Sequence, residues 1–301
     1  MDVSSRYGSK IAQLALWLVL GITLPAVCNA QQKHALMIGI SNYYTNGYKV
    51  WENIHGAEDI ALLTPVLKEK GFAVQSLTNE DATYEGIVHA LANIIGSCKQ
   101  GDVVYLHFSC HGQPVEDGLN GRGKDEEDGW DEAIVPIDAG REYNNVYKGE
   151  KHLTDDELNG YFTKLRKKIG PTGMLYVAMD ACHAGTTSCG GLETVRGTKE
   201  GLTKNGTKYN PPRDSTRHYS VERTPDMAPA LFIEACQPSE RNTEIRINGK
   251  DYGALSYNIW QALRAMPTLG KDSKTLLWLS VKASTQEAGR WPRTQTLVRE
   301  E

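Results

Sequence analysis

Apolar and polar positions along the chain follow two alternating patterns. Short apolar runs bounded by turn residues predict buried strands, which cover residues 34–40, 72–77, 103–108, 174–179 and 230–235. Apolar residues that recur every three or four positions predict helices, at residues 57–70, 83–97, 154–168, 253–266 and 273–287. A capping-box pattern from Thr154 to Glu157 marks the start of one of them. Because such alternation is typical of βαβ units, we expect an α/β fold with a mostly parallel central sheet.

Two polar segments interrupt this alternation. Residues 116–132 are acidic and glycine-rich, and residues 186–227 are rich in Gly, Pro, Lys and Arg with almost no apolar pattern. Long loops of this kind are uncommon in compact domains and are usually functional or disordered. We therefore interpret residues 31–301 as a single domain, in which a flexible linker at 186–227 joins a larger part, 31–185, to a smaller part, 228–301.

Residues 1–30 have the pattern of a signal peptide. Arg6 and Lys10 precede an apolar run over residues 14–24, and a small-residue site ends at Ala30. We expect removal of this segment and export to the periplasm or the extracellular space. The apolar run is shorter than the roughly 20 residues that span a bilayer, which disfavours a retained anchor. Lipid modification at Cys28 is the remaining alternative, and no later stretch is long enough to form an integral membrane segment.

Charge disfavours nucleic-acid binding, and the cysteine content indicates a reactive thiol. The 33 Lys and Arg residues are balanced by 37 Asp and Glu residues, so the chain has no overall basic character that would attract nucleic acid. The cysteines after the predicted cleavage point are Cys98, Cys110, Cys182, Cys189 and Cys236. An odd number in an exported protein leaves at least one thiol unpaired within the chain, which indicates a reactive cysteine.

Two predicted strands end in turns that carry His and Cys. The turns are Ser109-Cys110-His111-Gly112 and Asp180-Ala181-Cys182-His183. In parallel sheets, ligands bind outside the carboxyl ends of the strands. If the two strands are neighbours, His111 can activate the Cys182 thiol as a nucleophile. Gly112 would let a substrate approach the backbone closely, and the amides of Gly112 and Cys182 would form an oxyanion hole.

Each of these residues also has another interpretation. A cysteine at the end of a buried strand is most often a small core residue, and a single histidine near it is more often structural. A zinc site would use Cys110, His111, Cys182 and His183. Adjacent Cys and His side chains point in opposite directions in an extended turn, and the chain has no CxxC pair, so zinc is disfavoured.

Further motifs occur in a fixed order around the two turns. They are Ala35-Leu36-Met37-Ile38-Gly39-Ile40, Gly56-Ala57-Glu58-Asp59, Asp125-Glu126-Glu127-Asp128-Gly129-Trp130-Asp131-Glu132 and Phe232-Ile233-Glu234-Ala235-Cys236-Gln237. Together the motifs resemble the caspase-like superfamily, and the metacaspase branch more closely than the caspases of animal cell death. The resemblance implies a caspase-like fold, a three-layer sandwich with helices on both faces of the sheet. It also implies a monomeric cysteine endopeptidase with His111 as general base and Cys182 as nucleophile, a thioester intermediate and no cofactor in the chemistry.

The charge of the first substrate pocket predicts the residue before the cleaved bond. The resemblance places Asp59, Ser109 and Asp180 in this pocket, because metacaspases hold Lys or Arg with acidic residues. Ile54 stands about where an animal caspase would have Arg. Buried carboxylates bind a cationic side chain by charge-assisted hydrogen bonds, so we expect peptide and protein substrates to be cut after Arg or Lys. A solvated carboxylate at a helix start is the alternative for Asp59.

The two polar segments suggest calcium binding and self-cleavage. Asp125, Asp128 and Asp131 offer hard oxygen ligands, and calcium activates some relatives, so the acidic segment is a candidate calcium site. A solvated run of charges is the alternative. The linker carries basic residues at which an enzyme directed at Arg or Lys could cut itself: Arg196, Lys199, Lys204, Lys208, Arg213, Arg217 and Arg223. A disordered loop without processing is the alternative there.

Two other functions are compatible with the motifs. An inactive caspase-like domain would bind a peptide or a partner through the same crevice, but His111 and Cys182 are both present. A peptidase related to clostripain or gingipain would also cut after Arg or Lys. The acidic segment around Trp130 favours the metacaspase-like interpretation over these.

Overall fold

The computed structural model describes residues 31–45, 48–49, 51–119, 128–182, 194–210 and 223–301, so the predicted signal peptide lies outside the described residues. A six-stranded sheet forms the centre, in the order β13-β10-β9-β5-β1-β4. The strands are β1 (Lys33–Gly39), β4 (Ala73–Thr78), β5 (Val103–Ser109), β9 (Met174–Asp180), β10 (Ala230–Glu234) and β13 (Val298–Glu300). All neighbours are parallel except β10 and β13. The five predicted strands agree with the structure to within one residue at either end.

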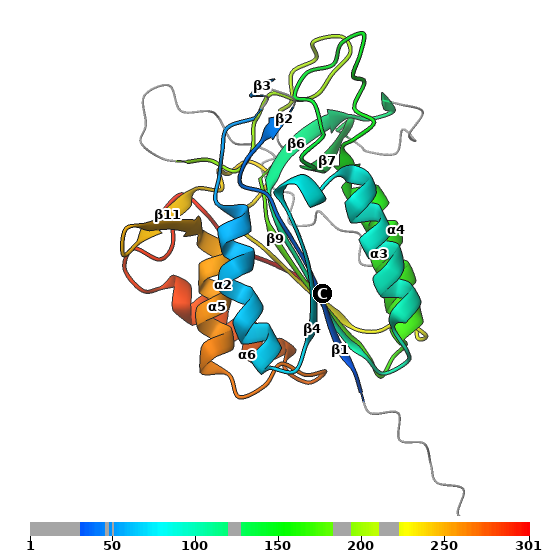
Figure 1. The fold of residues 1–301 in the computed structure, drawn as a ribbon, viewed down its shortest axis with the longest axis vertical. Helices are drawn as coiled ribbons and strands as arrows, with labels where there is room; N and C mark the ends of the chain where they lie inside the picture. The colour runs from blue at the N-terminus through cyan, green and yellow to red at the C-terminus, as the bar shows by residue number, and fades with distance from the viewer. Residues whose placement is uncertain (1–30, 46–47, 50, 120–127, 183–193, 211–222) are drawn as a thin grey trace, which may run out of the picture. The chain divides into compact units, whose positions relative to one another are not determined.

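Helices cover both faces of this sheet (Figure 1). They are α2 (Gly56–Glu69), α3 (Tyr84–Ser97), α4 (Asp155–Ile169), α5 (Ala254–Ala265) and α6 (Lys274–Thr285). The helices α3 and α4 pack on one face, and α2, α5 and α6 pack on the other. The predicted three-layer α/β sandwich is therefore confirmed. Among the described residues, no helix has both the length and the apolar character needed to cross a membrane.

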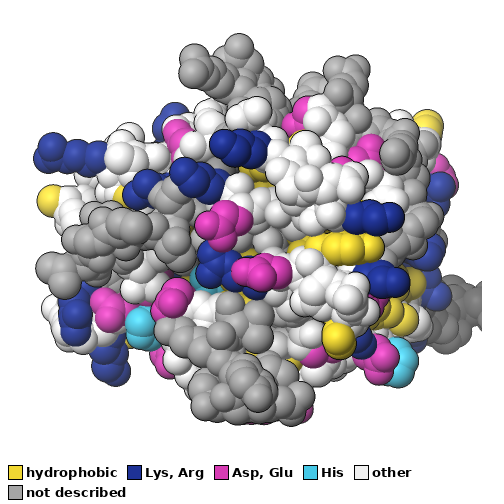
Figure 2. Space-filling model, turned by 90° about the horizontal axis from the view of Figure 1, so that it is seen from above, with side chains coloured by type: hydrophobic (Ala, Val, Ile, Leu, Met, Phe, Trp, Pro, Cys, Tyr) yellow, Lys and Arg dark blue, Asp and Glu magenta, His cyan; other side chains and the backbone are white. Residues whose placement is uncertain are grey.

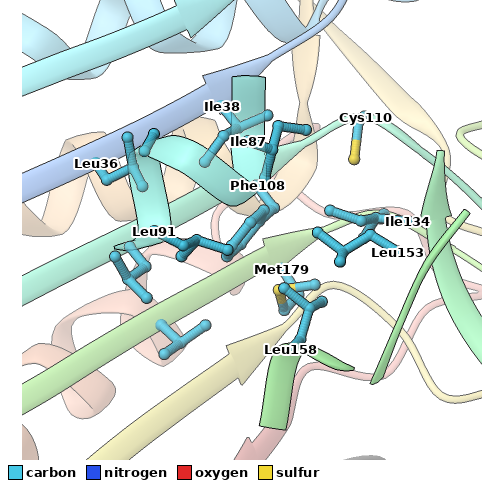
Figure 3. Packing of buried hydrophobic residues seen from close by; sticks show 14 of the residues in the cluster. Leu36, Ile38, Ile87, Leu91, Phe108, Cys110, Ile134, Leu153, Leu158 and Met179 are labelled. Atoms are coloured by element: carbon cyan, nitrogen blue, oxygen red, sulfur yellow. The ribbon is translucent and has the colours of Figure 1, made fainter. Parts of the chain in front are cut away.

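Alternation along the strands explains the two core layers. In β1, Leu36 and Ile38 face α3 and α4, whereas Ala35 and Met37 face the opposite layer. Figure 3 shows the first layer, where Phe108 of β5 packs among side chains of β1, α3 and α4. Burial of both sheet faces is why the central strands have nearly continuous apolar sequences.

Short strands of mixed polarity were not predicted. They are β2 (Tyr44–Thr45), β3 (Tyr48–Lys49), β6 (His111–Glu116), β7 (Trp130–Val135), β8 (Leu153–Thr154), β11 (Glu244–Ile247) and β12 (Lys250–Gly253). The strands β6 and β7 pair as a hairpin, so both ends of the predicted acidic loop are strand residues. A short 3-10 turn at Asn79–Asp81 was also missed.

The predicted capping box at the start of α4 is wrong. Thr154 is the N-cap residue with an extended backbone, but its side chain makes no capping hydrogen bond. Glu157 accepts a hydrogen bond from the Tyr84 hydroxyl at 2.6 Å instead of reaching back to the helix start. A hydrogen bond between α3 and α4 therefore takes the place of the expected capping bond within α4.

Candidate active site

The two turns with His and Cys lie at the carboxyl ends of neighbouring strands. β5 pairs in parallel with β9, and Ser109 is opposite Asp180 at the end of the ladder. His111 begins β6, and Cys182 follows β9 by two residues. This end of the sheet is the upper side of Figure 1, and Figure 2 looks down on it. On that face, acidic and basic side chains of the described residues lie among one another.

Aromatic side chains hold the His111 imidazole in one orientation. The ring of Trp51 stacks on it at 5.2 Å between centroids, and Tyr43 lies at 4.8 Å. The Tyr43 hydroxyl accepts a hydrogen bond from the His111 backbone amide at 2.9 Å. The imidazole Nε2 is 2.7 Å from the backbone carbonyl oxygen of Glu52, which can only accept, so Nε2 carries the proton. Burial lowers the pKa of His111 to about 4, so the ring is neutral at pH 7.

The other nitrogen of this ring is available as a base. The buried Nδ1 of His111 has no hydrogen-bond partner within the described residues. The Cys182 thiol donates instead to the backbone carbonyl oxygen of Glu240 at 3.0 Å, and Cys182 packs against Cys236. The predicted pair thus lies on adjacent strand ends without a hydrogen bond from Nδ1 to the thiol.

The three predicted pocket residues come together in the buried interior. Asp59, in the first turn of α2, accepts a hydrogen bond from the Ser109 hydroxyl at 2.7 Å. Asp180 accepts from the amide and hydroxyl of Ser256, at 2.8 and 2.6 Å, and from the Asn242 side chain at 2.7 Å. All three predicted residues are completely buried, so Asp59 is not a solvated helix-start carboxylate.

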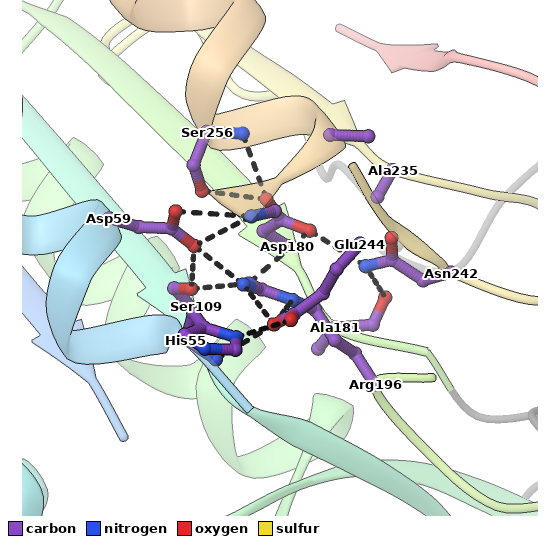
Figure 4. A network of polar contacts seen from close by, with 12 residues as sticks. His55, Asp59, Ser109, Asp180, Ala181, Arg196, Ala235, Asn242, Glu244 and Ser256 are labelled. Atoms are coloured by element: carbon purple, nitrogen blue, oxygen red, sulfur yellow. Dashed lines mark hydrogen bonds and ion pairs between the residues drawn. The ribbon is translucent and has the colours of Figure 1, made fainter. Parts of the chain in front are cut away.

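Arg196 fills this pocket with its guanidinium group (Figure 4). Its Nη2 is 2.8 Å from Asp59 and 2.8 Å from Glu244, and its Nη1 donates to the Ser109 hydroxyl at 2.5 Å. Asp180 lies 3.7 Å from Nη1. The Arg196 side chain is itself completely buried, so a residue from the predicted linker occupies the acidic pocket.

The segment that carries Arg196 pairs with residues 242–244 through backbone hydrogen bonds. Its amide donates to the carbonyl oxygen of Asn242 at 2.9 Å, and the amide of Glu244 donates to Thr194 at 3.0 Å. Val195 forms an antiparallel bridge with Thr243 between these two hydrogen bonds. Peptides that bind to a sheet edge use the same backbone pattern, with the side chains selected by pockets.

The backbone after Arg196 passes close to the candidate nucleophile. Gly197 forms a bridge with Gly112 in β6, and the Thr198 amide donates to the Gly112 carbonyl oxygen at 3.3 Å. A Cβ atom added at Gly197 would lie 1.8 Å from the Cys182 carbonyl oxygen. Only glycine fits at this position, directly after the arginine in the pocket.

Burial and charge oppose each other in the pocket. Burial raises the pKa of Asp59 to about 7, although the Arg196 cation acts in the other direction. Burial would also raise the pKa of Glu244, but Arg196 and His55 outweigh it and lower that pKa to about 2. Carboxylates packed this closely need a cation among them, because like charges in a buried site disfavour the ionised form.

The predicted calcium site stays a prediction, because not all of its ligands lie within the described residues. Asp125 lies outside them, Asp128 accepts a hydrogen bond from the Trp130 amide, and Asp131 is buried in β7. In this part of the chain, the one group of His, Cys and Asp or Glu close enough to share an ion is His34, Cys98 and Asp102. These lie near the opposite, amino ends of the strands. Cys110 packs in the core near Phe108, which further disfavours the zinc alternative.

Several residues of the site were not predicted. Glu244, Asn242 and Ser256 come from the smaller part of the domain, and Tyr43 and Trp51 come from the segment after β1. Their only sequence signal is nearness to the predicted motifs. The residue Ile54 packs in the core near Trp51 and does not contribute a charge to the pocket.

Comparison with known proteins supports one assignment. The fold is a three-layer α/β sandwich with its site at the carboxyl ends of the strands, and the caspase domain family matches residues 32–286. The chain therefore belongs to the caspase domain family, which is a family of cysteine peptidases.

Curated relatives and a solved structure agree with this family. Metacaspase-3 of Arabidopsis thaliana is 27% identical over 252 residues, which cover 79% of this chain and 62% of the relative. Metacaspase III c of Phaeodactylum tricornutum is 30% identical over 51% of this chain and 43% of the relative. The chain thus spans about half the length of the curated relatives it matches. A crystal structure of a Geobacter sulfurreducens protein has the same fold, with a TM-score of 0.57, 20% identity, and coverage of 89% of this chain and 92% of that one.

Proposed function

We propose that the protein is a cysteine endopeptidase that cleaves after Arg or Lys, with Cys182 as nucleophile and His111 as general base. The occupied acidic pocket carries this proposal. An arginine side chain is held there by carboxylates, its backbone pairs with residues 242–244 through hydrogen bonds, and the next residue, Gly197, lies against the Cys182 backbone carbonyl oxygen. Pairing of this kind presents a peptide in the manner of a substrate.

The mechanism follows from the tautomer of His111. The thiol proton of Cys182 passes to the lone pair on Nδ1, once the thiol turns away from the Glu240 carbonyl. The thiolate attacks the peptide carbonyl carbon, and the amides of Gly112 and Cys182 stabilise the oxyanion. His111 returns its proton to the leaving amine, which breaks the peptide bond and leaves a thioester. A water molecule, deprotonated by His111, then hydrolyses the thioester and frees the thiol.

The same arrangement supports self-processing. The Arg196–Gly197 bond is the proposed cleavage site, and until it is cut Arg196 excludes other substrates from the pocket. Calcium as an activator bound through the acidic segment, and function in an exported compartment, are also part of the proposal. Activity of an exported enzyme would be directed at proteins outside the cytoplasm.

Peptide hydrolysis tests the proposal directly. Peptides with Arg, Lys, Asp or Ala before the scissile bond are compared on the purified protein and its Cys182→Ala variant, with and without calcium. We expect cleavage after Arg and Lys, a loss of at least 1000-fold in Cys182→Ala, and a gain in rate with calcium. Mass spectrometry is expected to find a new amino terminus at Gly197 in the unsubstituted protein and an intact chain in the variant. Cleavage by Cys182→Ala at the original rate, or no cleavage at all, would leave the peptide-binding alternative.

Acid is expected to weaken substrate binding before it stops the chemistry. Protonation of Asp59 below about pH 7 removes a negative charge from the pocket, whereas His111 stays neutral until about pH 4. This pKa of Asp59 applies with an arginine in the pocket and is higher when the pocket is empty, so for Arg peptides KM should rise as the pH falls from 8 toward 7 and level off below it, while kcat is maintained down to pH 5.5. Steady-state kinetics across this range measure both. The Asp59→Asn variant should have a higher KM that no longer changes with pH, and a kcat that falls with a midpoint near 6.5 would contradict the assignment.

A further inference from the structure

We propose that Glu244 makes this pocket select arginine over lysine, and that His55 holds Glu244 in the orientation this requires. The inference rests on the proposed peptidase function. It concerns a third carboxylate, in addition to Asp59 and Asp180, which comes from the start of β11.

Glu244 binds the edge of the guanidinium group that a lysine lacks. Its Oε1 accepts from both Nε and Nη2 of Arg196, at 3.1 and 2.8 Å. Asp59 and Ser109 receive the outer nitrogens instead, Nη2 and Nη1. The three groups together surround a planar cation from different directions (Figure 4). A guanidinium group with several donors in one plane matches this arrangement.

A lysine side chain would satisfy only part of this arrangement. At the position of Nε it has a methylene group, which donates no hydrogen bond, so Glu244 would lose that partner. The ammonium group is a single charged centre, and it cannot occupy the positions of Nη1 and Nη2 at the same time. A buried carboxylate that loses its partner costs binding free energy, so the difference between Arg and Lys falls mainly on Glu244.

His55 fixes this carboxylate independently of the ligand. The His55 amide donates to Glu244 Oε1 at 2.7 Å, and its ring Nδ1 is 2.6 Å from Oε2. Both contacts remain when Arg196 leaves the pocket, because neither involves the guanidinium group. The ring lies at the start of α2, about one third exposed, whereas Glu244 is almost completely buried. His55 is therefore a positioning residue, which acts on substrate through Glu244.

The test compares matched Arg and Lys peptides on five proteins. Unsubstituted enzyme is expected to prefer Arg by about tenfold or more in kcat/KM. The Glu244→Gln variant should lose about 10- to 100-fold on Arg peptides, mainly in KM, and less than about threefold on Lys peptides. His55→Ala should reduce the preference for Arg, and His55→Asn, which keeps a donor near Nδ1, should restore most of it. Asp251→Asn is the control, because Asp251 lies 4.0 Å from the His55 ring but is not among the carboxylates that bind Arg196, which are Asp59, Asp180 and Glu244.

The possible outcomes separate this inference from the proposed function. If the unsubstituted enzyme cuts neither peptide, the peptidase function fails. If it cuts both equally, or if Glu244→Gln weakens both to the same extent, the role of Glu244 is overturned while the peptidase function stands. Should Glu244→Gln not fold, self-cleavage of Arg196→Lys gives a second test. Mass spectrometry should show slower release of the Gly197 terminus than in the unsubstituted protein, and equal rates would overturn the inference.

Discussion

Replacing Arg196 by Gln is expected to destabilise the folded protein by about 3 kcal/mol at pH 7.5, because it leaves buried carboxylates without a cation. The substitution is made in the Cys182→Ala background, so that self-cleavage does not change the chain. Asp59, Asp180 and Glu244 are fixed by hydrogen bonds from other residues and cannot turn toward solvent. Urea unfolding followed by circular dichroism measures the change.

The cost of this substitution should depend on pH. The pKa of Asp59 is already raised to about 7 by burial, and removal of the cation can only raise it further. A folded-state pKa above the unfolded value means that protonation favours the folded form, so the destabilisation should be largest above pH 7 and shrink toward pH 5. Glu244 adds to the size of the destabilisation, because Arg196 helps to lower its pKa. The stability from this lowered pKa is present throughout the range from pH 5 to 7.5, above the pKa of the unfolded state.

The conservative variant is the control for this result. Arg196→Lys keeps a positive charge in the pocket and should lose much less stability than Arg196→Gln. If both variants lose the same amount, or if Arg196→Gln is unaffected by pH, then the guanidinium group contributes through packing and not through its charge.

The central sheet and its helices were predictable because their signal is local. Strands buried on both faces, such as β5 and β9, have unbroken apolar sequences, and helices such as α3 repeat apolar residues at helical spacing. The carboxyl ends of such strands then locate His111 and Cys182. The short strand β6 gave no such signal, because its sequence His-Gly-Gln-Pro-Val-Glu is mostly polar although the strand is buried.

The occupant of the pocket could not be predicted from sequence. Arg196 is one of seven basic residues in a segment without an apolar pattern, and charged residues are usually exposed. Its burial depends on Asp59 and Glu244, which are more than a hundred and nearly fifty positions away along the chain. Local sequence shows which residues can ionise. Only the fold shows which of them share a buried site.

Substituting Gly253 by Ala is expected to close the acidic pocket and to reduce cleavage after Arg by at least 100-fold. A Cβ atom at this position would lie 2.1 Å from Asp180 Oδ2 and 2.6 Å from Arg196 Nη1, well inside van der Waals contact. Asp180 cannot move away, because Ser256 and Asn242 both hold it. The backbone at Gly253 has φ −61° and ψ 133°, which alanine adopts freely, so the effect is one of space and not of backbone strain.

Kinetics and stability together identify the cause of the loss in Gly253→Ala. We expect kcat/KM for Arg peptides to fall, self-cleavage after Arg196 to stop, and the melting temperature to decrease, because the methyl group also clashes with the Asp180 carboxylate. Gly160→Ala in α4 is the matched control. No atom outside the backbone of its own helix lies within 4 Å of its added Cβ, so it should keep full activity and gain about 0.5–1 kcal/mol of stability from helix propensity. Cleavage by Gly253→Ala at the unsubstituted rate would show that substrates do not enter the space which Arg196 occupies.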